Sequence, residues 1–499
     1  MPTRIAALFR ALGPAFVTAA VVLGPGSIVT NSKVGATYGY GMIWLLAAGI
    51  VLMIGMTALS ARLGICYPST LCETVAQRIG RPLAVLIGAS VFGICACFQV
   101  GNNLGIYTAL EPFVGGAEHP SRWLGISRPA AIVVTLNLLM VAFLFGFRRL
   151  YVYLERGMKI LVAVMLVAFA ANYVRVLARP LPAIEVEAAI EAETETEAET
   201  ETEAETETET ETESESEAAP PAGVQSATAQ SETRQTAGTP PDGAQSAAAG
   251  EIRRWSQLLL PRLTTAADGR TTIVDHWGPL VALLGTTFSV AGAFFQSYLV
   301  RQKGWNVDDV RHGLVDVVAG IGALGLISLV IMLTSATVLR GATITSAADI
   351  AGQLEPLFGR AAVWLFCLGL FAAAFSSLLV NAAIGGSLLA DGLGWGGYLE
   401  QPAARWCTVA ALTVGLTALV LRDAWGFDTV GLILVAQATT VLAWPLLAGV
   451  MMWLAVRGQW DARLRPPTWM WALGWTGLAV ALVLAPRTAY ILALQLWSR

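Results

Sequence analysis

Eleven apolar runs, most of them 18–28 residues long, follow one another along this chain. The hydrocarbon core of a bilayer is about 30 Å thick and needs roughly 20 apolar residues per helix, so each run is long enough to span a membrane. Only 13% of the 499 residues are charged, whereas a soluble protein averages roughly 25%. We therefore predict an all-α polytopic membrane protein, and the composition argues against a soluble multi-domain enzyme. The runs begin near Leu12, Gly41, Leu83, Pro129, Met158, Gly278, His312, Ala361, Arg405, Phe427 and Met470.

Basic residues in the connecting segments predict the orientation. They cluster at residues 4–10, 148–159, 301–311 and 457–465, which fall on one side if every run crosses the membrane. Lys and Arg are enriched in cytoplasmic loops. We expect a multi-pass protein of the cell (inner) membrane with a cytoplasmic N-terminus and an extracytoplasmic C-terminus, and with the lipid bilayer as its main partner.

The segment between the fifth and sixth runs has a different composition. Residues 185–217 hold 16 of the 35 acidic residues and none of the 31 Lys and Arg. Closely spaced Glu side chains repel one another, and the segment has little apolar surface to bury. We predict a disordered extracytoplasmic loop over residues 178–277, acting as a spacer or, alternatively, concentrating cations by its negative field.

The loop divides the chain into two halves of five runs each. Residues 1–177 would form helices 1 to 5, residues 278–456 helices 6 to 10, and residues 457–499 an eleventh helix with a C-terminal segment. The first run of each half contains residues that favour a broken helix: Leu23-Gly24-Pro25-Gly26-Ser27 in one, and the small and hydroxyl residues of 285–292 in the other. Paired broken helices at matching positions indicate the binding site of a secondary transporter.

Five segments in chain order carry a family resemblance: residues 24–40 with their Gly-Ala-Thr-Tyr-Gly-Tyr ending, 60–64, 285–300, 369–377 and Gln437. They resemble segments of the natural resistance-associated macrophage protein (Nramp) family of proton-coupled divalent-metal transporters. The resemblance implies a LeuT-like inverted 5+5 repeat with about 11 transmembrane helices, of which helices 1 and 6 are broken.

The residues that hold metal in the family are replaced here. Gly24 stands where the family has an aspartate, Ser27 where it has an asparagine, Ser289 where it has a methionine and Ala291 where it has a histidine. In the third run, residues 97–103 have neutral polar groups where family members carry acidic ones. We expect a divergent member with no metal site of the family type.

The substrate prediction follows from the neutral site. Broken helices present positive N-terminal and negative C-terminal ends, which together suit a small polar or zwitterionic, amino-acid-like solute. Two alternatives remain open: a divalent metal cation transporter, proton-coupled as in the family, with an altered and harder site, or a non-transporting receptor or sensor on the same scaffold. The candidate binding residues are Gly24, Pro25, Gly26, Ser27, Thr286, Thr287, Ser289 and Gln437.

Four further residues are candidates for the pathway or a gate. Lys33 would repel metals from the outer half of the first helix or extend to the interface. Asn102 and Asn103 would line the pathway or bond neighbouring helices. Asp316 would belong to an inner gate or pair with Arg311.

Other function classes lack their motifs. The sequence contains no His-Glu-x-x-His zinc motif and no Walker-type Gly-Lys-Ser/Thr loop, so we expect neither an enzyme nor an ATP-driven pump. We expect no cofactor and no nucleic-acid partner, only a small-molecule or ion substrate.

Overall fold

The computed structural model describes residues 13–114, 127–146, 150–178, 262–265, 271–274, 277–342, 344, 350–351, 359–425 and 441–497. The chain divides into two compact units, one formed by Met1–Leu177 with Leu260–Arg499 and the other by Ala178–Leu259. Everything described below belongs to the first unit, apart from the last residue of one helix. Gln437 lies outside the described residues.

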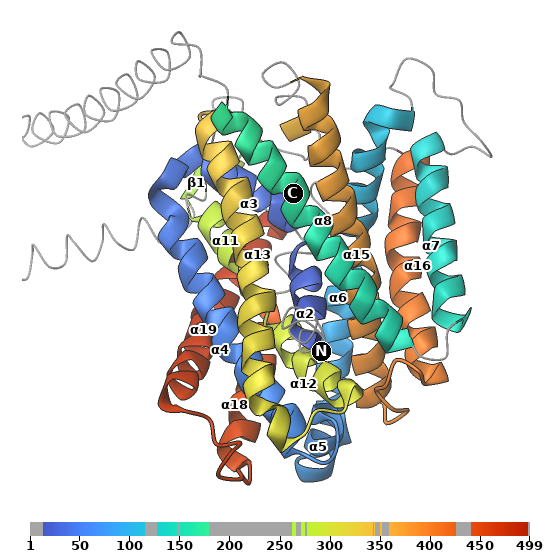
Figure 1. Cartoon of the computed structure of the whole chain (residues 1–499), viewed down its shortest axis with the longest axis vertical. Coiled ribbons are helices and arrows are strands. Elements are labelled where there is room, and N and C mark those ends of the chain that lie inside the picture. Colours follow the sequence, from blue (N-terminus) through green and yellow to red (C-terminus); the bar gives the residue numbers. More distant parts are fainter. Residues whose placement is uncertain are drawn as a thin grey trace, which may run out of the picture. The chain divides into compact units, whose positions relative to one another are not determined.

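Helices make up nearly all of the described residues of this unit (Figure 1). In chain order the elements are α2 (Pro14–Val22), α3 (Pro25–Tyr38), the short η1 (Gly39–Met42), α4 (Ile43–Cys66), α5 (Leu71–Arg78), α6 (Arg81–Val114), α7 (Arg128–Gly146), α8 (Leu150–Ala178), β1 (Arg262–Thr265), β2 (Thr271–Val274), α11 (Gly278–Thr287), α12 (Val290–Lys303), η2 (Val307–Asp309), α13 (Val310–Val338), α15 (Arg360–Gly392), α16 (Pro402–Trp425), α18 (Trp444–Arg457) and α19 (Thr468–Trp497).

Nine helical segments within the described residues are long and apolar enough to cross a membrane. The count differs from our eleven runs because the second half of the first run continues through η1 into the second, as one segment over Pro25–Cys66. The predicted tenth run begins at Phe427, outside the described residues, and only its later part is seen, as the shorter α18.

The first predicted break is confirmed between α2 and α3. Leu23 leaves helical geometry with ψ 71°, and Gly24 is extended with φ −105° and ψ 177°. Pro25 then opens α3, where its missing N–H and fixed φ are no disadvantage. The φ of Gly24 is one that any residue adopts, and a β-carbon there would lie 3.0 Å from Ser377 Oγ, so a larger residue fits if the Ser377 side chain moves by a few tenths of an ångström.

The second predicted break is confirmed between α11 and α12. Phe288 and Ser289 interrupt the helix with ψ values of 79° and 97°. The Ser289 hydroxyl accepts a hydrogen bond of 3.2 Å from the backbone N–H of Gly292, so it caps the new helix as serine commonly does.

The end of the predicted disordered loop needs a correction. β1 and β2 form an antiparallel hairpin in which Leu263 pairs with Ile273 and Thr264 with Thr272. These β-branched and apolar residues favour strands. Our prediction rested on the composition of the whole loop and did not consider this local preference.

Helices α6 and α15 pack with their backbones in contact. A β-carbon at Gly88 would lie 2.5 Å from the carbonyl oxygen of Leu388, and one at Gly392 would lie 2.5 Å from that of Ala84. Glycines on both helices therefore permit this approach, as small residues do between membrane helices. The pair forms one wall of the site described next.

Candidate functional site

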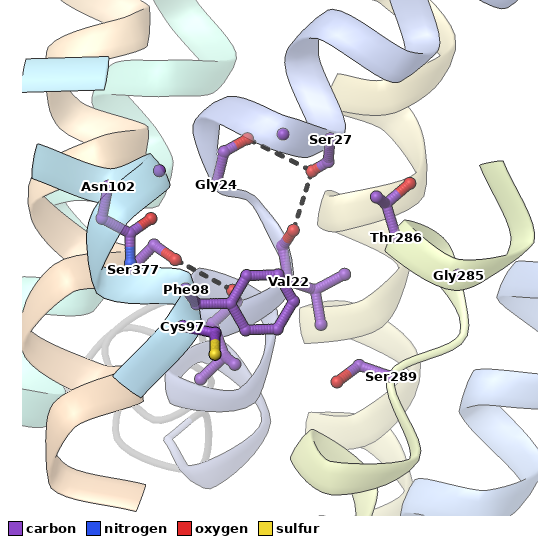
Figure 2. Close-up of a pocket in the computed structure, with 13 residues that line it drawn as sticks. Val22, Gly24, Ser27, Cys97, Phe98, Asn102, Gly285, Thr286, Ser289 and Ser377 are labelled. Carbon is purple, nitrogen blue, oxygen red and sulfur yellow. Dashed lines mark hydrogen bonds between the residues drawn. The ribbon is translucent and has the colours of Figure 1, made fainter. Parts of the chain in front are cut away.

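A cavity of about 50 Å³ lies where the two broken helices meet. Figure 2 shows it between α6 on one side and the α11–α12 break on the other, with the α2–α3 break across the middle. A void of roughly 10–15 Å³ holds one water, so this one has room for about three waters or for an ion with part of its hydration shell. Its lining residues are Val21, Val22, Gly24, Gly26, Ser27, Cys97, Phe98, Gly101, Asn102, Gly285, Thr286, Ser289 and Ser377.

Hydroxyl groups hold the last carbonyls of α2. The Ser27 hydroxyl donates to the carbonyl oxygen of Val22 at 2.8 Å, and the Ser377 hydroxyl of α15 donates to that of Val21 at 3.1 Å (Figure 2). The last carbonyls of a helix have no partner within the helix. These bonds therefore stabilise the broken end and leave the serine oxygens with lone pairs at the cavity.

The opposite wall is built from the second break. Thr286, near the end of α11, donates its hydroxyl proton to the carbonyl oxygen of Leu283 at 3.2 Å, and Ser289 lies at the start of α12. In Figure 2 both side chains lie on the side of the cavity opposite Asn102, and Thr286 lies near Ser27. The cavity thus has oxygen atoms on both sides.

Asn102 of α6 contributes an amide group to the cavity. The residue is 2% exposed, and its Nδ2 has no hydrogen-bond partner among the described residues. A buried polar atom without a partner costs free energy unless water or a ligand satisfies it. In Figure 2 the amide oxygen of Asn102 points toward Gly24, where a β-carbon would lie 3.4 Å from Oδ1, so the cavity is offered an acceptor by this amide.

The electrostatics of the cavity come from helix ends. None of the described residues that line it is charged. The C-terminal ends of α2 and α11 carry partial negative charge, and the N-terminal ends of α3 and α12 carry partial positive charge. Both a cation and a zwitterion find complementary groups here.

Of the predicted binding residues, Gly24, Gly26, Ser27, Thr286 and Ser289 line the cavity together. Pro25 and Thr287 do not: Pro25 packs against Gly105 of α6, and Thr287 is buried beside Gly49 of α4.

Only some of the candidates for the pathway or a gate lie at the cavity. Asn102 lines the cavity, whereas Asn103 points to α7, where its Oδ1 accepts from Asn137 Nδ2 at 2.7 Å. Lys33 is exposed on α3 and does not line the cavity.

Of the two interpretations left open for Asp316, the ion pair with Arg311 is not found among the described residues. Asp316 is fully buried, and its two carboxylate oxygens accept from the backbone N–H groups of Gly13 at 2.5 Å and Ala15 at 2.8 Å. A carboxylate is stabilising at the N-terminus of a helix because the free N–H groups there are donors. Asp316 of α13 therefore fastens the first turn of α2.

A second fastening joins α12 to α15. The Tyr298 hydroxyl donates to Asp391 Oδ2 at 2.6 Å and accepts from the backbone N–H of Cys72 at 3.2 Å. Both side chains are nearly fully buried. We call the bond between Tyr298 and Asp391 the latch. It lies beside α5, on the side that the basic residues predict to be cytoplasmic.

Apart from Asn102, the cavity residues contributed by α6 and α15 were not predicted from the sequence, above all Phe98 and Ser377. The pair Ser376-Ser377 in the middle of an otherwise apolar run was a usable signal, because polar groups within a membrane span commonly bond other helices or a ligand. Phe98 carries no such signal.

Comparisons with known proteins agree on family and fold. The model of the natural resistance-associated macrophage protein-like family matches residues 15–183 and 256–490. The divalent metal cation transporter MntH of Chromohalobacter salexigens is 30% identical over 174 residues, which are 34% of this chain and 37% of the relative. That of Bacillus subtilis is 29% identical over 160 residues, 32% of this chain and 35% of the relative. The matched stretch thus spans little more than a third of either relative's length.

Solved structures confirm the predicted LeuT-like fold. The manganese transporter of Eremococcus coleocola, in complex with an aromatic bis-isothiourea substituted compound, has a TM-score of 0.64 at 15% identity, covering 97% of this chain and 87% of that one. MhsT in complex with L-phenylalanine has a TM-score of 0.50 at 13% identity, covering 96% and 98%. At these identities the likeness shows the fold alone.

Proposed function

We propose a function from the premise that this chain belongs to the natural resistance-associated macrophage protein-like (Nramp) family, whose model matches most of its length. The chain is a secondary transporter that moves a divalent metal cation across the membrane by alternating access. The observation that carries this proposal is the cavity at the meeting point of two broken helices, where oxygen atoms from both halves of the chain converge.

The relatives favour a cation over our main prediction of an amino-acid-like solute. The curated relatives are named divalent metal cation transporters, which corresponds to the alternative that the sequence left open. The substitutions at the family's metal-binding positions would then determine which cation is preferred, and not whether a cation is bound.

The chemistry of the lining supports a hard, partly hydrated cation. Hydroxyl, carbonyl and amide oxygens suit Mg²⁺, Ca²⁺ and Mn²⁺, whereas soft metals prefer sulfur and imidazole. The described lining offers the hydroxyls of Ser27, Thr286 and Ser289 and the amide of Asn102, with one thiol, that of Cys97. Without a carboxylate the affinity must be low, since little offsets the loss of hydration. We infer weak binding with little preference for transition metals.

A zwitterionic solute is the second candidate. It is favoured by the absence of charge among the described lining residues and by the presence of both positive and negative helix ends at the cavity. Such a pair of ends holds a carboxylate and an ammonium group without any protein charge.

Gly24→Asp distinguishes the two candidates, with Gly24→Asn as a control of nearly equal size. A β-carbon at Gly24 would lie 3.0 Å from Ser377 Oγ and 3.4 Å from Asn102 Oδ1, so either side chain enters the cavity. Opposite unit charges 4 Å apart attract by about 4 kcal/mol at an effective dielectric constant near 20, and desolvation of the carboxylate offsets part of this. A net gain of about 1.4 kcal/mol is already tenfold in affinity.

The assay is calorimetric titration of purified protein with Mg²⁺, Mn²⁺ and glycine, followed by uptake into proteoliposomes. For a cation site, Gly24→Asp raises the Mg²⁺ and Mn²⁺ affinity at least about tenfold, and Gly24→Asn does not. Binding of glycine that Gly24→Asp weakens, without cation binding, supports the zwitterion instead. Cation binding with no uptake indicates the receptor or sensor alternative.

A further inference from the structure

We propose that Phe98 is a gate that divides the substrate pathway into two chambers, the central cavity and a second cavity on the side of α5. This inference rests on the proposed transport of a cation and identifies the step that follows its binding. Phe98 is not one of the site residues that the sequence predicted. We assign its role from its position between two voids.

The second void is small and adjoins the first. It has a volume of about 20 Å³, which holds roughly one water. Four residues line both voids and therefore form the boundary between them: Val21, Phe98, Gly285 and Ser289. They come from three elements that meet at the breaks, α2, α6 and the α11–α12 junction.

Phe98 is the only large side chain of the four. Val21 is aliphatic, Ser289 is small, and Gly285 has no side chain at all. Figure 2 shows the Phe98 ring extending from α6 toward Val22, across the space between Ser27 and Ser289. Rotation of this one ring is therefore the smallest movement that would join the two voids.

The order of residues along α6 supports the same arrangement. Gly101 and Asn102 line the central cavity, Ile94 and Cys95 line the second, and Phe98 lines both. Residues three and four apart lie on one face of a helix, so this face of α6 runs along both voids with Phe98 between them. The face leads toward Arg81 at the start of α6, which follows α5 on the predicted cytoplasmic side.

The second chamber gives an entering ion few oxygen atoms. Its side-chain oxygens are those of Ser289 and Asn381, and Ile384 and Trp444 make much of the rest apolar. An ion that passes Phe98 must therefore leave most of its water behind. Mg²⁺ dehydrates reluctantly, so Phe98 would limit the rate for strongly hydrated ions and distinguish among cations at this step.

Two native cysteines report on the two chambers. Cys97 lines the central cavity and Cys95 the second. The experiment uses two variants that each keep one of these thiols, with the other five cysteines replaced by alanine. Membrane vesicles of one orientation are treated on the extracytoplasmic side with a trimethylammonium-ethyl methanethiosulfonate that cannot cross the bilayer, and the rate of labelling is measured.

A gate that opens only in a minor state, populated at roughly 10% or less, predicts that Cys95 is labelled at least about tenfold more slowly than Cys97. Phe98→Ala should bring the Cys95 rate close to that of Cys97 and leave the Cys97 rate nearly unchanged. Phe113→Ala, at a partly exposed position of the same helix, should change neither rate. If Phe98→Ala does not fold, Phe98→Leu should give an intermediate rate.

Equal labelling of Cys95 in the native background and in Phe98→Ala would overturn the gate. Labelling requires no transport, so the two proposals fail separately. If the native protein carries no divalent cation but Cys95 becomes accessible on removal of the Phe98 ring, the gate stands and the proposed substrate is wrong. If cations are carried and the labelling of Cys95 does not depend on residue 98, the substrate stands and the gate is wrong.

Discussion

Loss of the latch between Tyr298 and Asp391 should shift the equilibrium between the closed and open forms of the protein toward the open form. It joins α12, which continues one of the broken helices, to α15, which packs closely on α6. Alternating access moves one group of helices against another around the site. If α12 moves away from α15 when the cytoplasmic side opens, the bond of 2.6 Å must break. Tyr298→Phe removes it while keeping the ring.

The size of the effect follows from the partners. A hydrogen bond to a charged group is worth about 1.5–3 kcal/mol, and a loss of about 2 kcal/mol changes an equilibrium constant about 30-fold. An equilibrium of about 99:1 in favour of the closed form would then move to about 3:1. The open form would rise from roughly 1% to roughly a quarter of the molecules.

Labelling of Cys95 from the cytoplasmic side measures this population, in the variant that keeps only this cysteine. The replacement of Cys72 in that background leaves the hydrogen bond to Tyr298 intact, because the backbone N–H of residue 72 makes it. Burial also raises the pKa of the Cys72 thiol well above its usual range, so this thiol has little part in the labelling of the native protein.

We expect labelling of Cys95 to be more than about tenfold faster in Tyr298→Phe. Tyr490→Phe, at an exposed position of α19, serves as the control and should have no effect. An unchanged rate in Tyr298→Phe would refute the reasoning, because it would mean that the bond does not hold the closed form together.

Two further predictions concern stability, each with a matched control. Asp316→Asn should lower the free energy of unfolding by about 1–2 kcal/mol, because its hydrogen bonds lose their charge; Asp308→Asn, in an ion pair whose two side chains are 83% and 74% exposed, should change it little. Thermal unfolding in detergent measures both, and equal effects would contradict the assigned role. On α6, Gly105→Ala should destabilise by about 1–3 kcal/mol, because the new methyl group would lie 2.1 Å from Pro25 Cγ. Gly93→Ala, with no atom within 4 Å of the new methyl group, should stabilise by up to about 1 kcal/mol. If Gly105→Ala and Gly93→Ala changed the free energy of unfolding in the same direction, the assigned packing of α6 would be wrong.

The sequence predicted the broken helices because their cause is local. A proline without an N–H, placed beside glycines, and hydroxyl residues in the middle of an apolar run are visible without any knowledge of packing. The structure places the breaks at Leu23-Gly24 and Phe288-Ser289, inside both predicted segments. Five of the seven described binding candidates line the cavity for the same reason.

The wall formed by α6 and α15 was not predictable in the same way. Both helices are apolar around most of their circumference, so no periodicity identifies the face that turns to the cavity. Asn102 and Asn103 are neighbours of the same type, yet only Asn102 reaches the cavity, and Asn103 bonds Asn137 of α7. Tertiary packing alone decides between them.

Asp316 gives the same lesson for charged residues. Arg311 was the obvious partner because it lies near in the sequence, whereas the groups that the carboxylate actually binds, at residues 13 and 15, lie some 300 positions away. Backbone N–H groups at the start of a helix leave no trace in side-chain composition.

The glycine contacts between α6 and α15 also determine which parts of the protein can move. At Gly88 and Gly392 main chain touches main chain, so a shift of one helix along the other would drive peptide groups into each other. We therefore expect the two helices to move as one rigid unit, so that in the proposed transport cycle the surrounding helices change position. Asn102 of α6 and Ser377 of α15 would then keep a constant spacing on their side of the cavity throughout the proposed cycle.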